Sequence, residues 1–212
     1  MKFHEFKTAI QYLPVFTGKD AARLGERQTM YNQLNNWRRK GLVIQLRRGS
    51  YVLGKADRKV EPGNLFLSGQ LYSPSYVSLE YALGLHGLIP EMVAQVTAVT
   101  TRNVASFKTD LGNFEYQHIK RQVFRGFRAA KDQAGQTYFL AEPEKAVADF
   151  IYLNLPRFKR GDREIFIQSY RFQNLESLNL KKVMSYAALF GSAKLTDIAT
   201  EFCKVAREEL KS

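Results

Sequence analysis

The sequence predicts an α+β protein, in which helices and strands occupy separate stretches of the chain. Apolar residues recur at helical spacing near both ends, whereas short β-branched and alternating stretches fall between residues 95 and 140. An aperiodic segment, GKADRKVEPGN at 54–64, separates the N-terminal pattern from the rest. With 212 residues, 45% of them hydrophobic, the chain can bury one large core or two smaller ones. We therefore expect two domains, at residues 1–58 and 62–212.

Two helices are expected before residue 25. The first ends at Pro14, and its apolar side chains recur at helical spacing: Phe3, Phe6, Ile10 and Leu13. Thr17 and Asp20 then have the spacing of a capping box, in which a hydroxyl and a carboxylate satisfy free N–H groups of a first turn. A short second helix with Ala21 and Leu24 follows.

A third helix is predicted at 27–40, and a hairpin follows it. Met30, Leu34 and Trp37 form one apolar stripe, and Gly41 is a suitable C-terminal stop. Residues 42–46 and 51–53 are the predicted strands, with arginines in the turn between them. The order helix, helix, helix, hairpin predicts a winged helix-turn-helix in the first domain.

The second domain is predicted to be mixed α/β with a helical C-terminal tail. The expected elements are a helix at 76–88, a buried strand at 95–101, a hairpin at 104–119, a strand at 137–140, a helix from Pro143 to before Pro156, and helices at about 179–190 and 196–210. Cys203 lies on the apolar pattern of the last helix and is expected to fill the core.

The basic charge of the chain is concentrated near its N-terminus. The formal net charge is +12. Residues 1–60 hold 13 Lys or Arg against four acids, a net of +9, and the remaining residues hold 19 against 16, a net of +3. A local concentration of this kind is typical of a nucleic-acid footprint, whereas a charge that serves solubility is spread over the surface.

The third helix carries the side chains expected to read DNA. Opposite its apolar stripe lie Gln28, Asn32, Asn35 and Arg39, flanked by Tyr31 and Arg38, and the hairpin turn adds Arg47 and Arg48. Gln and Asn can pair with adenine and Arg with guanine, while the hairpin arginines can reach phosphates or the minor groove. We predict that these eight residues bind double-stranded DNA.

Signals of catalysis are scarce, and we expect no enzyme, no catalytic residues, no cofactor and no metal. Phosphate-binding, nucleophile-elbow and dinucleotide motifs are missing, and the three histidines are far apart. Two alternatives stay open. Asp110 and Glu115 could serve a metal-dependent nucleic-acid enzyme, although Gln117 stands where a catalytic lysine is wanted. The protein could also bind nucleic acid generally, without sequence preference.

The sequence also sets an expectation about cellular localisation and one about a helix start. No apolar run of about 18 residues and no apolar leader sequence occurs, which predicts a cytoplasmic protein without a membrane partner. The charged run at 142–145 is expected to form a first helical turn favoured by the helix dipole.

A series of segments resembles the AbiEi antitoxins of bacterial abortive-infection toxin–antitoxin systems. They are FTGKDAARL at 16–24, GLV at 41–43, RGSY at 48–51, SYVSLEYAL at 75–83, HGLIP at 86–90, VTAVTTR at 96–102, FEYQH at 114–118 and AEPEKA at 141–146. The resemblance implies a winged helix that represses its own promoter by binding repeats, and a second, antitoxin-type domain that antagonises a nucleotidyltransferase-like toxin. It implies no catalytic residues, and it leaves open both direct contact with the toxin and a role as a solitary regulator.

Overall fold

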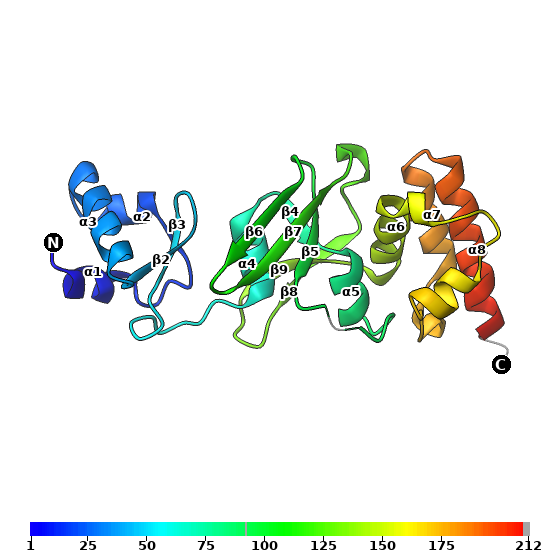
Figure 1. The fold of residues 1–212 in the computed structure, drawn as a ribbon, viewed down its shortest axis with the longest axis horizontal. Coiled ribbons are helices and arrows are strands. Elements are labelled where there is room, and N and C mark those ends of the chain that lie inside the picture. The colour runs from blue at the N-terminus through cyan, green and yellow to red at the C-terminus, as the bar shows by residue number, and fades with distance from the viewer. Residues whose placement is uncertain (92, 210–212) are drawn as a thin grey trace.

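The computed structural model describes residues 1–91 and 93–209. Figure 1 shows three parts in a row: the N-terminal helices with their hairpin, a six-stranded sheet, and a group of C-terminal helices. The fold is α+β, as predicted, and the last element described is a long helix.

The N-terminal part contains three helices and a small sheet. The helices are α1 (Phe3–Ile10), α2 (Gly18–Ala22) and α3 (Arg27–Arg39), and the strands are β1 (Phe16–Thr17), β2 (Val43–Arg47) and β3 (Ser50–Leu53). The sheet has the order β1-β3-β2 with antiparallel pairs. The helices and the hairpin predicted for this part are all present.

Local sequence explains where α2 and α3 begin and where α3 ends. The predicted capping box is confirmed, since the Asp20 carboxylate accepts from the Thr17 backbone N–H at 2.8 Å. At α3, the Glu26 carboxylate accepts from the backbone N–H groups of Gln28 and Thr29 at 2.8 and 2.6 Å. Gly41 then takes φ +71°, a left-handed conformation that glycine adopts at little cost and that ends a helix.

The apolar stripe of α3 packs into a small aromatic core. Met30, Leu34 and Trp37 are all buried, as predicted. The Trp37 ring centroid lies 4.6 Å from that of Phe6 and 5.5 Å from that of Phe3. Since Phe3 and Phe6 come from α1, this contact fixes α3 on the first helix.

The hairpin β2–β3 is buried on both faces. Val43, Tyr51 and Leu53 belong to the N-terminal core. Leu46 and Val52, which are 6% and 0% exposed, belong instead to the core of the second part. The two cores therefore pack on opposite sides of a single strand pair.

Residues 54–63 connect the two parts and form neither helix nor strand. This segment is hydrogen-bonded on both sides. The Lys59 N–H donates to the carbonyl of Gln11 at 2.9 Å, and the Gln136 side chain accepts from the Gly63 N–H at 2.9 Å and donates to the Glu61 carbonyl at 2.8 Å. The division at residues 58 and 62 stays a prediction, because the hairpin before it contacts both cores.

A mixed six-stranded sheet forms the centre of the second part. Its order is β6-β7-β5-β4-β9-β8, with β5–β7 and β4–β9 parallel and the other pairs antiparallel. The strands are β4 (Ser75–Val77), β5 (Val96–Thr100), β6 (Ala105–Thr109), β7 (Gly112–His118), β8 (Phe127–Lys131) and β9 (Thr137–Ala141). The strands predicted at 95–101 and 137–140 are confirmed as β5 and β9, and the hairpin predicted at 104–119 is confirmed as β6–β7.

Three details of the second part differ from the prediction. The helix expected at 76–88 begins only at Leu79, as α5 (Leu79–Leu85), because Tyr76 and Val77 pair with β5 in the sheet. The helix α4 (Asn64–Leu71) and the strand β8 were not expected. Tertiary pairing overrides local periodicity in β4, which is short and pairs with β5 and β9. β8 pairs with the next strand, β9, as the edge strand of the sheet.

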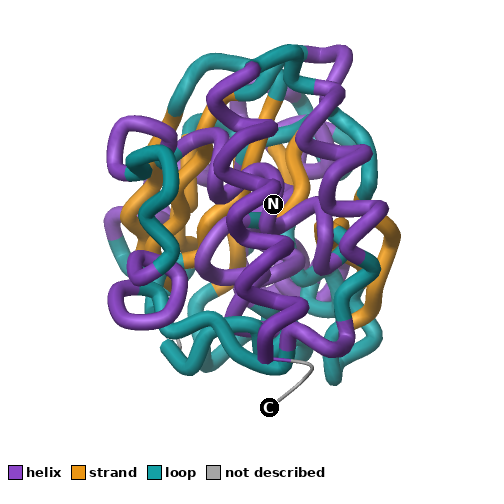
Figure 2. Tube along the Cα trace, turned by 90° about the vertical axis from the view of Figure 1, so that its right-hand side faces the viewer, coloured by secondary structure: helices purple, strands orange, loops and turns teal. Residues whose placement is uncertain are grey.

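Three longer helices follow the sheet, as predicted. They are α6 (Pro143–Leu153), α7 (Leu180–Leu189) and α8 (Ala193–Glu209), with short helical turns at Leu155–Arg157, Ile165–Ser169 and Leu175–Ser177. Another such turn, at Arg121–Val123, lies between β7 and β8. Figure 2 looks onto these helices, which lie in front of the strands. Cys203 is buried at 2% exposure, as expected, whereas residue 210 of the predicted last helix lies outside the described residues.

No helix in the described part of the chain combines the length and hydropathy needed to cross a membrane.

The packing of α3 can be tested by Trp37→Ala. Removal of this buried ring empties the contact with α1, and we expect the free energy of unfolding to fall by about 3–5 kcal/mol. Tyr31→Ala is the matched control, because Tyr31 is an aromatic residue of the same helix but 55% exposed. Its effect should stay within about 0.5 kcal/mol in the same urea titration. Equal effects of the two substitutions would contradict the placement of the helix.

Candidate nucleic-acid interface

Positive charge in the N-terminal part gathers around α3 and the hairpin. Two of the four acids of this part pair with other cations: Asp57 with Lys7 at 2.9 Å, and Asp20 with Arg23 at 3.7 Å. The other two, Glu5 and Glu26, accept from backbone N–H groups at the starts of α1 and α3. In the chain as described, no ion pair involves the cations of α3 or the hairpin, which are Arg27, Arg38, Arg39, Arg47 and Arg48. All five are exposed, so their charge is available to a polyanion.

The face of α3 opposite the buried stripe carries the predicted reading residues. Gln28, Asn32 and Arg39 are exposed, whereas Asn35 is half-buried. Gln28 Nε2 donates to Asn32 Oδ1 at 3.3 Å, and the Arg39 guanidinium donates to the amide oxygen of Asn36. These side chains keep further donors and acceptors, because an amide offers two N–H groups and a guanidinium five.

The two predicted flanking residues differ in their surroundings. Tyr31 is 55% exposed on α3. Arg38 is also exposed, but its guanidinium donates to the amide oxygen of Gln45 on β2. Arg38 therefore holds the helix to the hairpin, in addition to any contact with DNA.

The hairpin turn places its two arginines differently. Gly49 takes φ +82° and permits the tight turn after Arg48. Burial raises the pKa of Tyr116 on β7, and the positive charge of Arg47 opposes that rise. Leu46, the residue before Arg47, packs into the core of the second part, while Arg48 occupies the turn.

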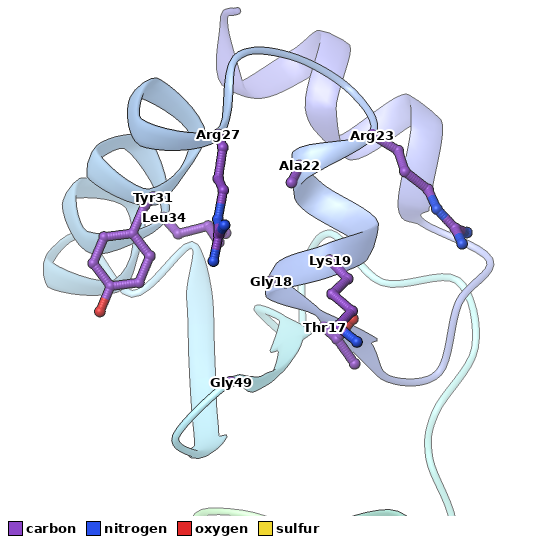
Figure 3. Close-up of a pocket in the computed structure, with 9 residues that line it drawn as sticks. All are labelled: Thr17, Gly18, Lys19, Ala22, Arg23, Arg27, Tyr31, Leu34 and Gly49. Atoms are coloured by element: carbon purple, nitrogen blue, oxygen red, sulfur yellow. The ribbon is translucent and has the colours of Figure 1, made fainter.

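A groove of about 750 Å³ lies between α2, α3 and the hairpin turn. Figure 3 shows Arg27 pointing into the space between the two helices, with Lys19 on the opposite wall, whereas Arg23 points away. Tyr31 and Gly49 also line the groove, which joins the flank of α3 to the turn.

Lys19 and Arg27 were not among the predicted site residues. The sequence holds a signal for Arg27, which stands four residues before Tyr31, a spacing that places both on one face of α3. Lys19 has no such signal, because Arg23, four residues on, points away from the groove. Their position across the groove depends on how α2 packs on α3, and single-helix periodicity does not contain that information.

The acids proposed for an alternative nuclease site are not arranged as a metal centre. Glu115 accepts at both carboxylate oxygens, from Gln95 at 2.6 Å and Gln117 at 2.8 Å, and Asp110 lies in the exposed turn between β6 and β7. Among the described residues, no group of three His, Cys, Asp or Glu side chains is placed to hold a metal ion.

Two of the three histidines contact backbone carbonyl groups. A ring nitrogen of His86 lies 2.8 Å from the Ala141 carbonyl oxygen, and one of His118 lies 2.8 Å from that of Arg102. His4 is exposed on α1.

The charged run at 142–145 forms the N-cap and first turn of α6, as predicted, and part of it is buried. Glu142 does stand at the helix N-terminus and pairs with Lys182 at 2.8 Å. Glu144 is only 7% exposed and accepts from the Asn179 N–H at 3.1 Å. The charged run therefore forms the first helical turn, as predicted, and α7 packs against this end of α6 and supplies these partners.

Lys145 lies deeper, in a polar network that the sequence did not predict. Lys145 and Asp149 form an ion pair with both side chains 0% exposed. The Tyr76 and Ser78 hydroxyls each donate to Asp149 at 2.9 Å, and Lys145 Nζ lies 4.8 Å from the Phe190 ring centroid. Burial lowers the pKa of Lys145 and raises that of Asp149, and the attraction within the pair opposes both shifts. The network joins β4 to α6.

No protein-family model matches the chain, and no curated protein matches it significantly.

The buried pair predicts a large cost for removing one partner. Lys145→Met leaves the Asp149 carboxylate buried without its cation, and we expect the free energy of unfolding to fall by about 3–5 kcal/mol. Lys181→Met is the matched control, because Lys181 is exposed on α7. The control should change stability by no more than about 0.5 kcal/mol in the same denaturant titration. If Lys145→Met changes the free energy of unfolding as little as the control does, the network does not support the structure.

Proposed function

We propose that this protein is a cytoplasmic transcriptional regulator that binds double-stranded DNA, with α1–α3 and the hairpin acting as a winged helix-turn-helix. The observation that carries the proposal is the exposed face of α3, where Gln28, Asn32 and Arg39 lie together beside cations without acidic partners in the described chain. A helix of this kind fits the major groove, which is about 12 Å wide. The protein acts by binding, not by catalysis.

Base recognition and backbone recognition fall to different residues. Gln28 and Asn32 can form paired hydrogen bonds with adenine, and Arg39 can do so with guanine. Arg48 at the hairpin turn and Lys19 and Arg27 in the groove meet the phosphates, because they lie beside the reading face and not on it. Arg47 adds to the positive potential of this surface, and it is a weaker candidate for direct contact because its neighbour Leu46 packs into the core of the second part.

The proposal extends to an antitoxin role in a toxin–antitoxin pair, in which the second part antagonises a nucleotidyltransferase-like toxin. Its support is the AbiEi-like series of segments. Those beyond residue 62 fall on β4 with α5, on β5, on β7 and on the start of α6, which are neighbours in one body. We also propose that the first part binds repeats in the promoter of its own gene.

Substitutions on α3 should change sequence discrimination. Asn32→Ala and Arg39→Ala each remove hydrogen bonds to base edges, so each should weaken binding to the promoter duplex by about 1–3 kcal/mol. Binding to unrelated DNA should change much less. Gln33→Ala, on another face of the same helix, is the control. Unchanged discrimination in both variants, in a titration at constant salt, would refute this assignment of the reading face.

Arg48→Ala should act on affinity rather than on discrimination. Because Arg48 is expected to meet a phosphate, its loss should weaken binding to promoter and unrelated DNA alike. The slope of log affinity against log salt should shrink by about 0.9, the value for one phosphate contact. Lys159→Ala removes an exposed cation between α6 and α7 and should leave the slope unchanged.

Incubation of labelled DNA with the protein and Mg²⁺ tests the alternative that the protein is a metal-dependent nuclease, since any cleavage would contradict a role confined to binding.

The antitoxin role can be separated from DNA binding in the full-length chain. Asn32→Ala, Arg39→Ala and Arg48→Ala together should abolish promoter repression but preserve protection when the variant is co-expressed with an adjacent nucleotidyltransferase-like gene. All three side chains are exposed, so the variant should stay folded. Continued killing by that gene product in the presence of the wild-type chain would rule out the antitoxin role.

A further inference from the structure

One aromatic ring on α3 is exposed and has no partner in the protein. Within residues 14–53, all of which the structure describes, Tyr31 is the only large hydrophobic side chain that is exposed, at 55%. No hydrogen bond or ring contact joins Tyr31 to another described residue. The ring therefore gains little burial energy in the free protein, and its apolar faces are available to a binding partner.

Tyr31 lies on the flank of α3 that joins the reading face to the groove. It stands three residues after Gln28 and four before Asn35, so these three side chains share one flank of the helix. Tyr31 also lines the groove together with Arg27. Figure 3 shows the Tyr31 ring projecting outward from α3. The ring thus stands between the amides proposed to read bases and the cations proposed to meet phosphates.

The major groove of DNA offers one apolar group to such a ring. Thymine carries a 5-methyl group there, whereas the other groups that identify a base pair are hydrogen-bond donors and acceptors. Gln28, on the same flank as Tyr31, is suited to adenine, and the partner of that adenine is a thymine. An aromatic face can cover a methyl group while the phenol hydroxyl, at the tip of the ring, stays hydrated.

We propose that Tyr31 is a specificity-determining residue whose ring packs against the 5-methyl group of a thymine in the promoter. This role rests on the proposed binding of DNA by α3, and it adds recognition of an apolar group to the hydrogen bonds of the amides and arginines. Uracil keeps every hydrogen-bonding group of thymine and lacks only the methyl group. Replacement of one thymine by uracil therefore isolates the contact.

The test uses the full-length chain and the duplex from upstream of its gene, in which each thymine is replaced in turn by uracil. At the position that Tyr31 contacts, the wild-type chain should bind the uracil duplex about fourfold more weakly, the effect expected for one buried methyl group. Binding should be measured at constant salt, because phosphate contacts make affinity depend on salt.

Three variants assign the effect to the ring. Tyr31→Ala should bind the thymine and uracil duplexes equally, and its unchanged binding of unrelated DNA would show that it is folded. Tyr31→Phe keeps the ring without the hydroxyl and should retain the wild-type ratio of the two affinities. Gln33→Ala, on another face of α3, is the matched control and should also retain that ratio.

Several results would overturn this role of Tyr31. One is wild-type binding that no single uracil weakens, and another is an undiminished ratio in Tyr31→Ala. Loss of the ratio in Tyr31→Phe would assign the effect to the hydroxyl, and equal weakening of promoter and unrelated DNA by Tyr31→Phe would indicate a phosphate contact instead. Failure of the wild-type chain to bind the unmodified duplex is a distinct result, which would refute the DNA-binding proposal and this role with it.

Discussion

The burial of the β2–β3 hairpin on both faces is the constraint on which the rest of the structure depends. Tyr51 packs into the N-terminal core, and its neighbour Val52 packs into the core of the second part. The Arg38 guanidinium of α3 donates a hydrogen bond to Gln45 of the same hairpin, so α3 is fixed to the hairpin. The exposed face of α3 and the arginines of the turn therefore keep a fixed spacing, which a rigid DNA-binding surface requires.

The ion pairs of the molecule leave its positive charge unevenly distributed. Asp20 and Asp57 pair with cations away from the reading face of α3, at Arg23 and Lys7. In the second part, acids and cations nearly balance, and Glu142 and Asp149 pair with neighbouring lysines. The excess positive charge is thereby left around α3 and the groove, where it can act on a polyanion.

Elements that carry their own signal were predictable from the sequence. The stripe on α3, the β-branched strand β5 and the Pro-initiated α6 are local patterns, and each is found in the structure. The strand β4 was mistaken for helix because its partners β5 and β9 are distant in the sequence. The edge strand β8 was missed although its partner β9 follows it directly. The burial of Lys145 and the place of Lys19 across the groove likewise arise from packing between elements. The spacing of residues within a single helix or strand predicts neither the burial of Lys145 nor the position of Lys19.

Amide hydrogen exchange of the full chain, with and without a duplex from the region upstream of its gene, tests the location of the interface most directly. The account predicts slower exchange on DNA binding at residues 28–39 of α3 and around the hairpin turn at 47–49. Exchange in α7 and α8, at the far end of the molecule in Figure 1, should not change. Protection confined to the second part, with α3 unaffected, would contradict the account.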